Sequence, residues 1–403
     1  MASIINNRNI LCIATPQWKS DYASTTVELM KIFGQHNMLL YVSSGYTVKD
    51  VFTAFLKGER LPFAEIFGFK SRLKTVFKSE EGQISLLIIP LQIPVNFLPK
   101  GKLYNLLLKI NGYIAKRSIV KYLIKLKMQD GLIYINSFNP ALGIQTVGRM
   151  GELVSIYHCY DEISAAPWMS RHGADLENEM FQLVDATIVT SQGLYEEKKH
   201  KTKCFLVKNA ADFELFSKAF NPNSRHGRVV GFIGSLDERI DYGLLQFAIE
   251  HLPNFNFVFI GRVTECLEVN KLKENHNVTV LDPKPLLELP KFVKEFDVGI
   301  IPFRKIRFTK GIYPLKINEY LAAGLPVVTT DFGYLNDFEG MIHIAKDQQQ
   351  FVSEIQEAIR TNTVEKKLAR QSYAKHNSWN NRSIEFSQVI CSIEVENKNI
   401  NKR

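Results

Sequence analysis

Short, continuous apolar runs alternate along the chain with longer stretches in which apolar residues recur every three or four positions. Continuous runs are typical of strands buried on both faces of a parallel sheet, and the longer spacing is typical of amphipathic helices. In the first half, this pattern predicts strands at 9–15, 38–43, 84–90, 132–136, 154–158, 186–190 and 204–207, and helices at 21–33, 103–128, 140–150 and 175–183.

The second half repeats the alternation after a polar stretch at 220–228, which we interpret as a linker. Regular alternation predicts an α/β fold with two doubly wound, Rossmann-like parallel-sheet domains, at 1–219 and 229–375, facing a central cleft that binds the ligands. The polar tail at 396–403 is expected to be flexible. Strands are predicted at 229–233, 255–260, 278–281, 298–301, 327–330 and 342–344, and helices at 242–251, 286–296, 314–323, 348–361 and 364–376.

The composition excludes several classes of protein. Hydrophobic residues make up 45% and charged residues 23%, which is ordinary for a globular protein and excludes a disordered chain. The five cysteines lie far apart without a C-x-x-C pair, so neither a zinc framework nor a disulfide scaffold is indicated. The polar start is unlike a signal peptide, and no run reaches the ~18 apolar residues of a membrane span. We therefore expect a soluble, cytoplasmic protein.

The net charge of +9 is concentrated in one segment. Residues 57–127 hold 14 Lys and Arg against 4 Asp and Glu, a local charge of +10, so the rest of the chain is nearly neutral. The segment ends in the predicted helix at 103–128, in which basic residues at spacings of four or seven form one stripe. The stripe consists of Lys109, Lys116, Arg117, Lys121 and Lys125, and the apolar face is expected to consist of Leu106, Ile110, Ile114, Leu123 and Leu126.

Two interpretations of this helix stay open. Its basic stripe fits an anionic membrane surface, which would make the protein peripheral on the inner face of the plasma membrane. It also fits a surface helix that packs its apolar side on a sheet and leaves the basic side in water. A nucleic-acid partner is not expected, because the chain has no recognised binding motif and no interleaved basic and aromatic residues.

The segment 300–328 carries the most informative candidate chemistry, as a strand, a loop, a short helix and another strand. Pro314 suits a first helical turn, and Gly324 suits a helix end. The unpaired amides that begin such a helix can hold a phosphate, and Lys316 adds a cation beside them. Glu319, one turn further on, can accept two ribose hydroxyls. This combination predicts a nucleotide-diphosphate-sugar site, and an ordinary βαβ unit with a surface lysine and glutamate is the alternative.

Two other features are weaker. The turn at 231–236 follows the first strand of the second domain, where Gly234 would let a phosphate approach the backbone. It is neither a G-x-G-x-x-G motif nor a Walker loop, so a plain tight turn fits equally well. The segment 157–162 ends a strand of the first domain and carries the potential bases His158, Asp161 and Glu162. A histidine at the end of a strand is also commonly structural.

Taken together, the chain resembles a GT-B fold glycosyltransferase of the family 4-like type (glycosyltransferase group 1), in the subgroup that builds bacterial surface polysaccharides. The most specific match is the pattern P-x-K-x-x-E-Y-L-A-A-G-x-P-V-V from Pro314 to Val328. The start of the family's final helix, which crosses back to the first domain, is similar here, so a helix is expected over 376–395. The resemblance also rests on Tyr160-Asp161-Glu162, on Asn209, Asp212 and Phe216, on Gly231–Leu236 with Asp241-Tyr242, and on Ser378, Trp379 and Arg382.

The resemblance implies a metal-independent enzyme of the hexosyltransferase type, without a cofactor, that acts in polysaccharide biosynthesis. It would move a sugar from a nucleotide-sugar donor to a saccharide or lipid-linked acceptor, with retention of configuration. His158 and Asp161 are the candidate catalytic residues, and the acceptor would enter past Gln17, Trp18 and Tyr22. The implied donor-binding residues are Gly234, Ser235, Arg239, Lys310, Gly311, Ile312, Lys316 and Glu319.

The chain departs from the family pattern at two places. Many relatives carry two glutamates eight positions apart, and here Glu319 fits the second while Gly311 stands at the first. Backbone amides around 310–312 are therefore expected to take over the contact with the sugar. The family's arginine–lysine pair after the first strand is also incomplete, because Ser235 replaces the arginine and Arg239 only approximates the lysine.

Two rival classes stay open. A nucleotide-sugar epimerase has the same two-domain cleft, but it would need acid and base groups around C2 of the sugar. A non-catalytic sugar-binding protein can also consist of two α/β domains. The predicted helix start that can hold a phosphate and the lack of a signal sequence argue against that second class.

Overall fold

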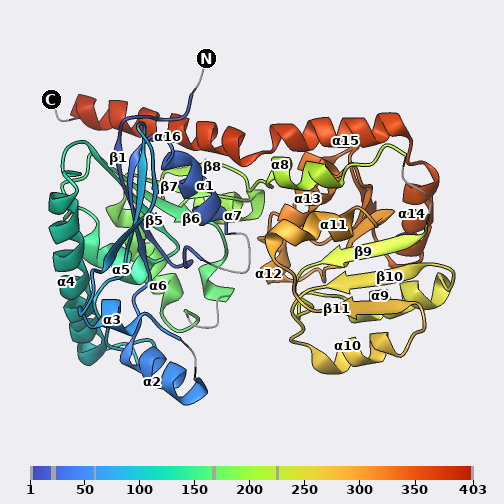
Figure 1. Ribbon diagram of the computed structural model, residues 1–403, viewed down its shortest axis with the longest axis horizontal. Coiled ribbons are helices and arrows are strands. Elements are labelled where there is room, and N and C mark those ends of the chain that lie inside the picture. Colours follow the sequence, from blue (N-terminus) through green and yellow to red (C-terminus); the bar gives the residue numbers. More distant parts are fainter. Residues whose placement is uncertain (1–2, 20–23, 59, 166–168, 224–226, 401–403) are drawn as a thin grey trace. The chain divides into compact units, whose positions relative to one another are not determined.

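The structure is a computed structural model that describes residues 3–19, 24–58, 60–165, 169–223 and 227–400. The chain forms two compact units, which Figure 1 colours along the sequence. The first consists of Met1–Lys208 together with Arg382–Arg403, and the second consists of Asn209–Asn381. Each unit has its own parallel-stranded sheet, as the alternating sequence pattern predicts.

The first unit contains an eight-stranded sheet in the order β3-β4-β2-β1-β5-β6-β7-β8. Neighbouring strands are parallel except at the edge, where β3 is antiparallel to β4. The chain reverses direction across the sheet between β1 and β5, which is the doubly wound arrangement. The strands are β1 (Asn9–Ala14), β2 (Met38–Ser43), β3 (Leu73–Lys78), β4 (Gln83–Leu87), β5 (Leu132–Ser137), β6 (Val154–Cys159), β7 (Ala186–Val189) and β8 (Cys204–Leu206).

Several elements of this unit were absent from the sequence prediction. β3 is an exposed edge strand, and α7 is a short helix in which only Leu194 and Lys198 are buried. The sequence analysis overlooked α2, although its apolar residues recur at helical spacing. The predicted helices are present with shifted ends. The helices are α1 (Thr25–Phe33), α2 (Val48–Lys57), α3 (Phe63–Ile66), α4 (Lys102–Lys125), α5 (Pro140–Thr146), α6 (Gly173–Leu183) and α7 (Gln192–Lys198), with a 3-10 turn η1 (Ile163–Ala165).

The basic helix α4 buries a different face from the one predicted. Leu106 is 55% exposed and Ile110 is 38% exposed, so the assignment of these two residues to the buried face was wrong. Small and aromatic side chains make the contact instead, because α4 packs closely enough on α5 that a Cβ at Gly112 would lie 2.4 Å from Gln145 Cβ. Within the described part of the chain, no helix is long and apolar enough to cross a membrane. The buried face consists of Tyr104, Leu108, Asn111, Gly112, Ala115, Ser118, Ile119, Tyr122 and Leu123.

The second unit contains a six-stranded, all-parallel sheet in the order β11-β10-β9-β12-β13-β14. Numbered from its own first strand, this is the order 3-2-1-4-5-6 of nucleotide-binding sheets, with the switch point between β9 and β12. Ligands bind such sheets at the carboxyl ends of the strands beside the switch point. The strands are β9 (Val229–Ile233), β10 (Asn256–Ile260), β11 (Val278–Leu281), β12 (Val298–Ile301), β13 (Val327–Thr330) and β14 (His343–Ala345).

Helix α13 (Leu315–Ala322) ends as its sequence predicts. Gly324 has a left-handed φ of 75°, and its N–H donates to Leu321 O at 2.9 Å. The N–H of Leu325 donates to Tyr320 O at 3.0 Å, which completes a Schellman motif. The other helices are α8 (Phe213–Phe216), α9 (Tyr242–His251), α10 (Cys266–Lys273), α11 (Leu289–Val293), α12 (Arg307–Lys310), α14 (Gln348–Arg360) and α15 (Val364–His376), with 3-10 turns η2 (Ser217–Ala219), η3 (Leu286–Glu288) and η4 (Asn336–Phe338).

The chain divides earlier than the predicted linker at 220–228. Residues 209–219, which we expected in the first domain, belong to the second unit, where Leu215, Phe216 and Ala219 are part of the hydrophobic core. Part of the predicted linker, 224–226, lies outside the described residues. The sequence misplaced the boundary because the polar stretch is a surface loop that follows the first elements of the second unit.

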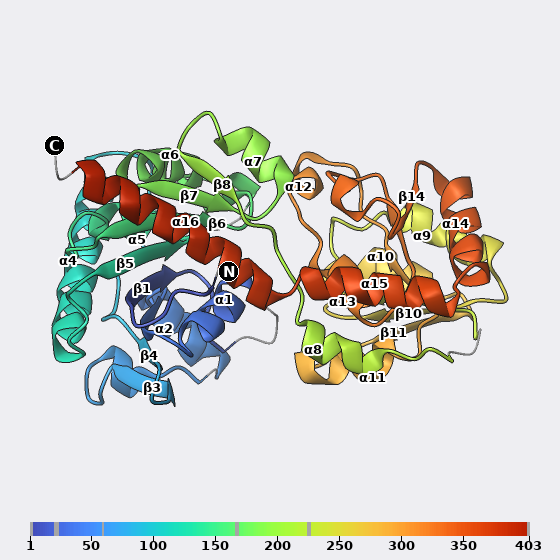
Figure 2. The same cartoon turned by 90° about the horizontal axis from the view of Figure 1, so that it is seen from above.

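The last helix, α16 (Trp379–Ile400), returns to the first unit, and Figure 2 shows it lying along that unit's strands. Ile5 N–H donates to Ser387 Oγ at 3.1 Å, and Arg8 pairs with Glu394 at 2.9 Å. The prediction of a flexible tail at 396–403 was wrong for its first part. α16 is helical to Ile400, and Asn397 Nδ2 donates to Leu153 O at 3.1 Å, whereas 401–403 lie outside the described residues.

Replacing Gly324 by alanine tests the tight end of α13. Its positive φ costs any other residue about 1–2 kcal/mol. A Cβ there would also lie 2.8 Å from the ring of Phe220, which adds an overpacking cost of about 1–3 kcal/mol. Gly340 is a matched control, because its φ is 76° and a Cβ would meet nothing within 4 Å. Urea unfolding should show a larger decrease in the free energy of unfolding for Gly324→Ala than for Gly340→Ala. Equal decreases would contradict the packing argument.

Candidate functional site

Helix α13 begins at the carboxyl end of the second sheet with its first amides uncapped. Pro314 is the N-cap residue, one position before the predicted first turn, and it offers no side-chain hydrogen bond. The first amides of a helix have no partner within the helix. Here Ile317 N–H already donates to Pro314 O at 3.2 Å, which leaves the amides of Leu315 and Lys316 for a ligand. Together with the positive end of the helix dipole, they favour an anion.

Two glycines make room for the Lys316 side chain. Gly234 follows β9 with a φ of 146°, and a Cβ there would lie 2.3 Å from Cε and 3.0 Å from Nζ of Lys316. Gly261 follows β10 with a φ of 156°, and a Cβ there would lie 2.0 Å from Gly234 O. Only glycine permits this approach. The structure therefore brings Gly234 and Lys316 together. It adds Gly261, which an isolated glycine directly after a strand could have signalled.

Glu319 lies one turn after Lys316 and is 9% exposed. Burial raises the pKa of Glu319, although Lys316 opposes this effect, and Asp212 raises it further. Burial likewise lowers the pKa of Lys316, and Glu319 opposes that effect. The two charges therefore interact in a poorly hydrated place, where electrostatic contacts with a ligand are stronger than in water. Asp212 also caps α8 by accepting from Leu215 N–H at 3.0 Å.

Arg239 reaches the same space, but it already has a carboxylate partner. Its Nε donates to Asp237 Oδ1 at 2.8 Å, and its guanidinium lies 5.5 Å from the centroid of the Phe303 ring. Burial is the main cause of the lowered pKa of Lys316, and the charge of Arg239 contributes to it. Arg239 therefore lies close enough to act on an anion near Lys316, with its own charge partly offset by Asp237.

The loop around 310–312 has fewer free amides than predicted. The N–H of Gly311 donates to Phe308 O at 3.2 Å, and the N–H of Ile312 donates to Thr309 O at 3.1 Å. The N–H of Lys310 closes the single turn of α12. These three amides are engaged in backbone hydrogen bonds, which contradicts the expectation that they face the sugar. Ser235, next to Gly234, is half-buried.

In the first unit, His158 has the surroundings of a core residue. It is 1% exposed at the end of β6, its Nδ1 lies 3.2 Å from Ser137 Oγ, and the ring of Phe386 packs edge-on at 5.5 Å. Burial lowers the pKa of His158 to about 3, so the imidazole is neutral at ordinary pH. An enclosed, neutral imidazole has no access to a substrate. The structural interpretation of His158 therefore replaces the prediction of a catalytic base.

Asp161 is half-buried in the loop after β6, and the next residue anchors that loop. Glu162 accepts from Ser164 Oγ at 2.6 Å and pairs with the buried Lys198 at 3.2 Å. Lys198 also pairs with Glu177 at 2.8 Å. Burial alone would raise the pKa of Glu162, but Ser164 and Lys198 outweigh it and lower the pKa. This buried ion-pair network, which the sequence analysis missed, holds the Asp161 loop at the carboxyl end of the sheet.

The predicted acceptor-side residues follow β1. Trp18 packs edge-on against Tyr41 with ring centroids 5.0 Å apart, Gln17 is exposed, and Tyr22 lies outside the described residues. Beside them, a cavity of about 590 Å³ opens at the carboxyl ends of the strands. Sequence reasoning missed most of this cavity, because its lining comes from loops without a motif. It is lined by Thr15, by Ser44, Gly45, Thr47, Lys49 and Asp50, by Ile89 and Gln92–Phe97, and by residues of α4, α5 and their neighbours.

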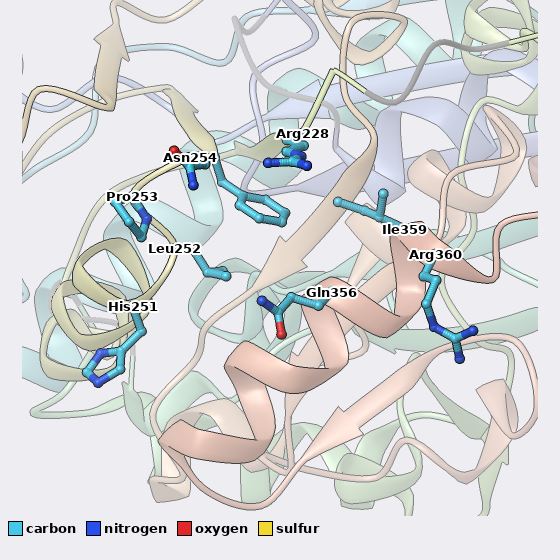
Figure 3. A pocket seen from close by; sticks show the side chains of 9 residues that line it. Arg228, His251, Leu252, Pro253, Asn254, Gln356, Ile359 and Arg360 are labelled. Atoms are coloured by element: carbon cyan, nitrogen blue, oxygen red, sulfur yellow. The ribbon is translucent and has the colours of Figure 1, made fainter.

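A second cavity lies in the second unit, at the opposite ends of its strands. It measures about 550 Å³, and Figure 3 shows it between the residues that precede β9 and β10 and the side chains of α14. Arg228 and Asn254 come from the strand side, and Gln356, Ile359 and Arg360 come from α14. Because doubly wound sheets bind ligands at the carboxyl ends of their strands, this cavity is separate from the Lys316 site.

The second unit thus combines a nucleotide-binding strand order with a phosphate-type helix start at its switch point, and comparisons with known proteins agree with this class. Residues 227–361 match the family described as "Glycosyl transferases group 1". The chain is 29% identical over 199 residues to the "Putative teichuronic acid biosynthesis glycosyltransferase TuaH" of Bacillus subtilis (strain 168). That similarity covers 44% of this chain and spans about half, 50%, of the relative's length.

Solved structures show the same fold over nearly the whole chain. Sucrose-phosphate synthase from Thermosynechococcus elongatus is similar with a TM-score of 0.67 at 12% identity, covering 97% of this chain and 100% of that chain. The Anabaena protein Alr3699/HepE in complex with UDP is similar with a TM-score of 0.61 at 13% identity, covering 95% and 100%. These neighbours are GT-B glycosyltransferases, and the fold of this protein is therefore GT-B, as predicted.

The buried His158 predicts how stability depends on pH. The imidazole of the unfolded chain protonates near its ordinary pKa of 6.5, whereas that of the folded protein resists protonation down to about 3. The contribution of the neutral His158 to the free energy of unfolding is fully present above the pKa of the unfolded chain. As the pH falls below that pKa, this contribution decreases by about 1.4 kcal/mol per pH unit. His158→Gln should flatten the fall in unfolding free energy between pH 7 and pH 5, measured by urea unfolding. An unchanged slope would show that His158 titrates normally.

Replacing Lys198 by methionine should be strongly destabilising. It leaves Glu162 and Glu177 buried without their cation, and removing one partner of a buried pair costs about 3–5 kcal/mol. Lys199→Met is the matched control, since Lys199 pairs with Glu196 at a more exposed position, where a pair contributes less than about 1 kcal/mol. Thermal unfolding of the two variants should separate them clearly. Similar melting temperatures would show that the network does not hold the unit together.

Proposed function

We propose that the protein is a glycosyltransferase that moves a hexosyl group from a nucleotide-diphosphate-sugar to a saccharide or lipid-linked acceptor. The observation that carries the proposal is the placement of Lys316 and Glu319 on the first turns of α13, next to the strand end at Gly234. A cation, uncapped amides and a carboxylate there complement a diphosphate and a ribose. The group 1 match over this unit supports the same assignment.

The donor would lie across the carboxyl ends of β9 and β12. Its diphosphate would accept hydrogen bonds from the first amides of α13 and from the ammonium group of Lys316. Glu319 would accept from the ribose hydroxyls, provided that its carboxylate is ionised. A bound diphosphate raises the pKa of Lys316 because it adds negative charge beside the ammonium group. The Anabaena neighbour is a complex with UDP and, in a second structure, with UDP and glucose, which supports a nucleotide-sugar donor.

Stabilisation of the leaving nucleotide would be the main catalytic contribution of this unit. Negative charge develops on the diphosphate as its bond to the sugar breaks, and prearranged cations lower the energy of that state. Lys316 and the helix amides would provide this stabilisation, with Arg239 as a further cation. The diphosphate would then compete with Asp237 for the guanidinium group of Arg239. No metal or cofactor has a part in this mechanism, and retention of configuration follows from the resemblance alone.

The acceptor would bind the first unit. The cavity of about 590 Å³ lies at the carboxyl ends of its strands, beside Gln17 and Trp18, and it has polar groups on a largely apolar lining. Asp161 is the remaining candidate for a group that contacts the reacting sugar. The similarity to a teichuronic acid biosynthesis protein supports a role in bacterial cell-surface polysaccharide synthesis. Docking at the inner face of the plasma membrane belongs to the same proposal, through Lys109, Lys116, Arg117, Lys121 and Lys125.

Substitutions at α13 test the donor site. Lys316→Ala and Glu319→Ala should each lower kcat/KM by about a hundredfold or more, since each removes a contact to the leaving nucleotide or its ribose. Lys271→Ala and Glu268→Ala are matched controls, because that pair lies exposed on α10. The measurement is nucleotide release from UDP-, GDP- and dTDP-sugars, after a thermal-shift screen has identified the donor that stabilises the protein.

Near-normal kcat/KM in either α13 variant would refute the site assignment. Isomerised sugar formed from the donor without an acceptor would instead indicate an epimerase. Donor binding without nucleotide release, for any acceptor tried, would indicate a non-catalytic binding protein.

A further inference from the structure

Exposed apolar side chains gather on one part of the first unit. Among the described residues, 15 of the 21 large hydrophobic side chains that are exposed lie between Val48 and Ile124. That range is about a fifth of the chain, so the exposed apolar residues are strongly concentrated there. Isolated exposed hydrophobic residues are normal, but a concentration of this kind marks an interaction surface.

Helix α2 shows the concentration most clearly, because its apolar side faces outward. Ala54 is its only buried residue, whereas Phe52 is 62% exposed, Phe55 is 78% exposed and Leu56 is 68% exposed. With Val48, these residues follow the spacing of a single helical face. An amphipathic helix of a globular protein turns such a stripe toward the core. The orientation of α2 therefore implies that something outside the described structure covers this stripe.

Further exposed apolar side chains lie after α3 and on α4. Phe67 and Phe69 follow α3, with ring centroids 6.5 Å apart, and Phe69 is 84% exposed. The start of α2 and the middle of α4 line the same cavity. α4 adds Leu106 and Tyr113, which are 55% and 63% exposed. We name this surface, formed by the exposed side chains of α2, α3 and α4, the apolar rim.

The apolar rim overlaps the most basic segment of the chain, because α2 ends where that segment begins and α3 and α4 lie inside it. Residues 57–127 carry a charge of +10, and exposed Lys57, Lys70, Lys109 and Arg117 lie beside the apolar positions. A surface that combines apolar side chains with cations fits an anionic lipid layer, into which the apolar groups insert while the cations contact phosphates. A second copy of the chain fits poorly, because a two-fold contact would place the same basic segments opposite each other.

We propose that α2 and the residues after α3 insert their exposed side chains into the surface of an anionic membrane, with the cations of α4 binding the lipid phosphates. Phe52, Phe55, Leu56 and Phe69 are the inserting residues. This inference deepens the proposed function, because the cavity shared by α2 and α4 would then open close to the lipid surface. A lipid-linked acceptor could enter that cavity without leaving the membrane.

Vesicle flotation of the full chain tests the inference. The wild type should float with vesicles of equal parts phosphatidylglycerol and phosphatidylcholine, and it should bind phosphatidylcholine alone far more weakly. Phe52→Ser, Phe55→Ser and Leu56→Ser should each weaken binding about tenfold. Lys109→Gln and Arg117→Gln should each weaken it about fivefold, and this loss should vanish at high salt. The combined Leu267→Ser and Leu287→Ser variant is the matched control, since both residues are exposed in the second unit.

Phe55→Trp adds a direct signal, because its fluorescence should shift to shorter wavelength when the vesicles are added. The inference is overturned if the wild type does not bind anionic vesicles, or if the α2 variants bind as tightly as the control. It is also overturned if the α2 substitutions convert a dimer into a monomer and leave vesicle binding unchanged. Donor stabilisation in the thermal-shift screen should be the same in all α2 variants, so failure of the donor site is distinguishable from failure of membrane docking.

Discussion

The close approach of the Lys316 side chain to the backbone at Gly234 is the constraint on which the candidate site depends. A Cβ at Gly234 would lie 2.3 Å from Lys316 Cε, and one at Gly261 would collide with Gly234 O. The two strand ends and the start of α13 can therefore meet only if both positions are glycine. That meeting places an ammonium group, uncapped amides and Glu319 around one space, and burial of the two charged groups strengthens their interactions there.

The first unit uses its buried polar groups differently. Lys198, Glu162 and Glu177 form a closed network with short contacts, and His158 is neutral among aromatic rings. Buried charges are tolerated only when they are paired, so this network fixes the loop after β6 rather than serving as a reactive site. The half-buried Asp161 lies on the loop that the network holds. Asp161, the candidate reactive group, is thus next in the chain to Glu162, which has a structural role.

The two units also differ in their surfaces. The positive charge of the first unit and most of the exposed large apolar side chains of the described residues fall in the same part of the chain, whereas four of those side chains lie in the second unit: Leu267, Leu287, Val364 and Leu368. The two sheets share a parallel architecture, but the apolar stripe of α2 in the first unit faces outward. The difference between the units therefore lies in their surfaces and not in their topology.

The sequence by itself determined the alternation of strands and helices, the two parallel sheets and the placement of Lys316 and Glu319 on one helix. These features depend on local periodicity and on residues close together in the chain. Only the tertiary structure decided which side of α4 is buried, where the chain divides, and that His158 is enclosed. Those outcomes depend on contacts between distant segments: α5 packing on α4, residues 209–219 joining the second core, and Phe386 of α16 covering His158. Local pattern cannot encode such contacts, because a buried position and an exposed position can carry the same residue.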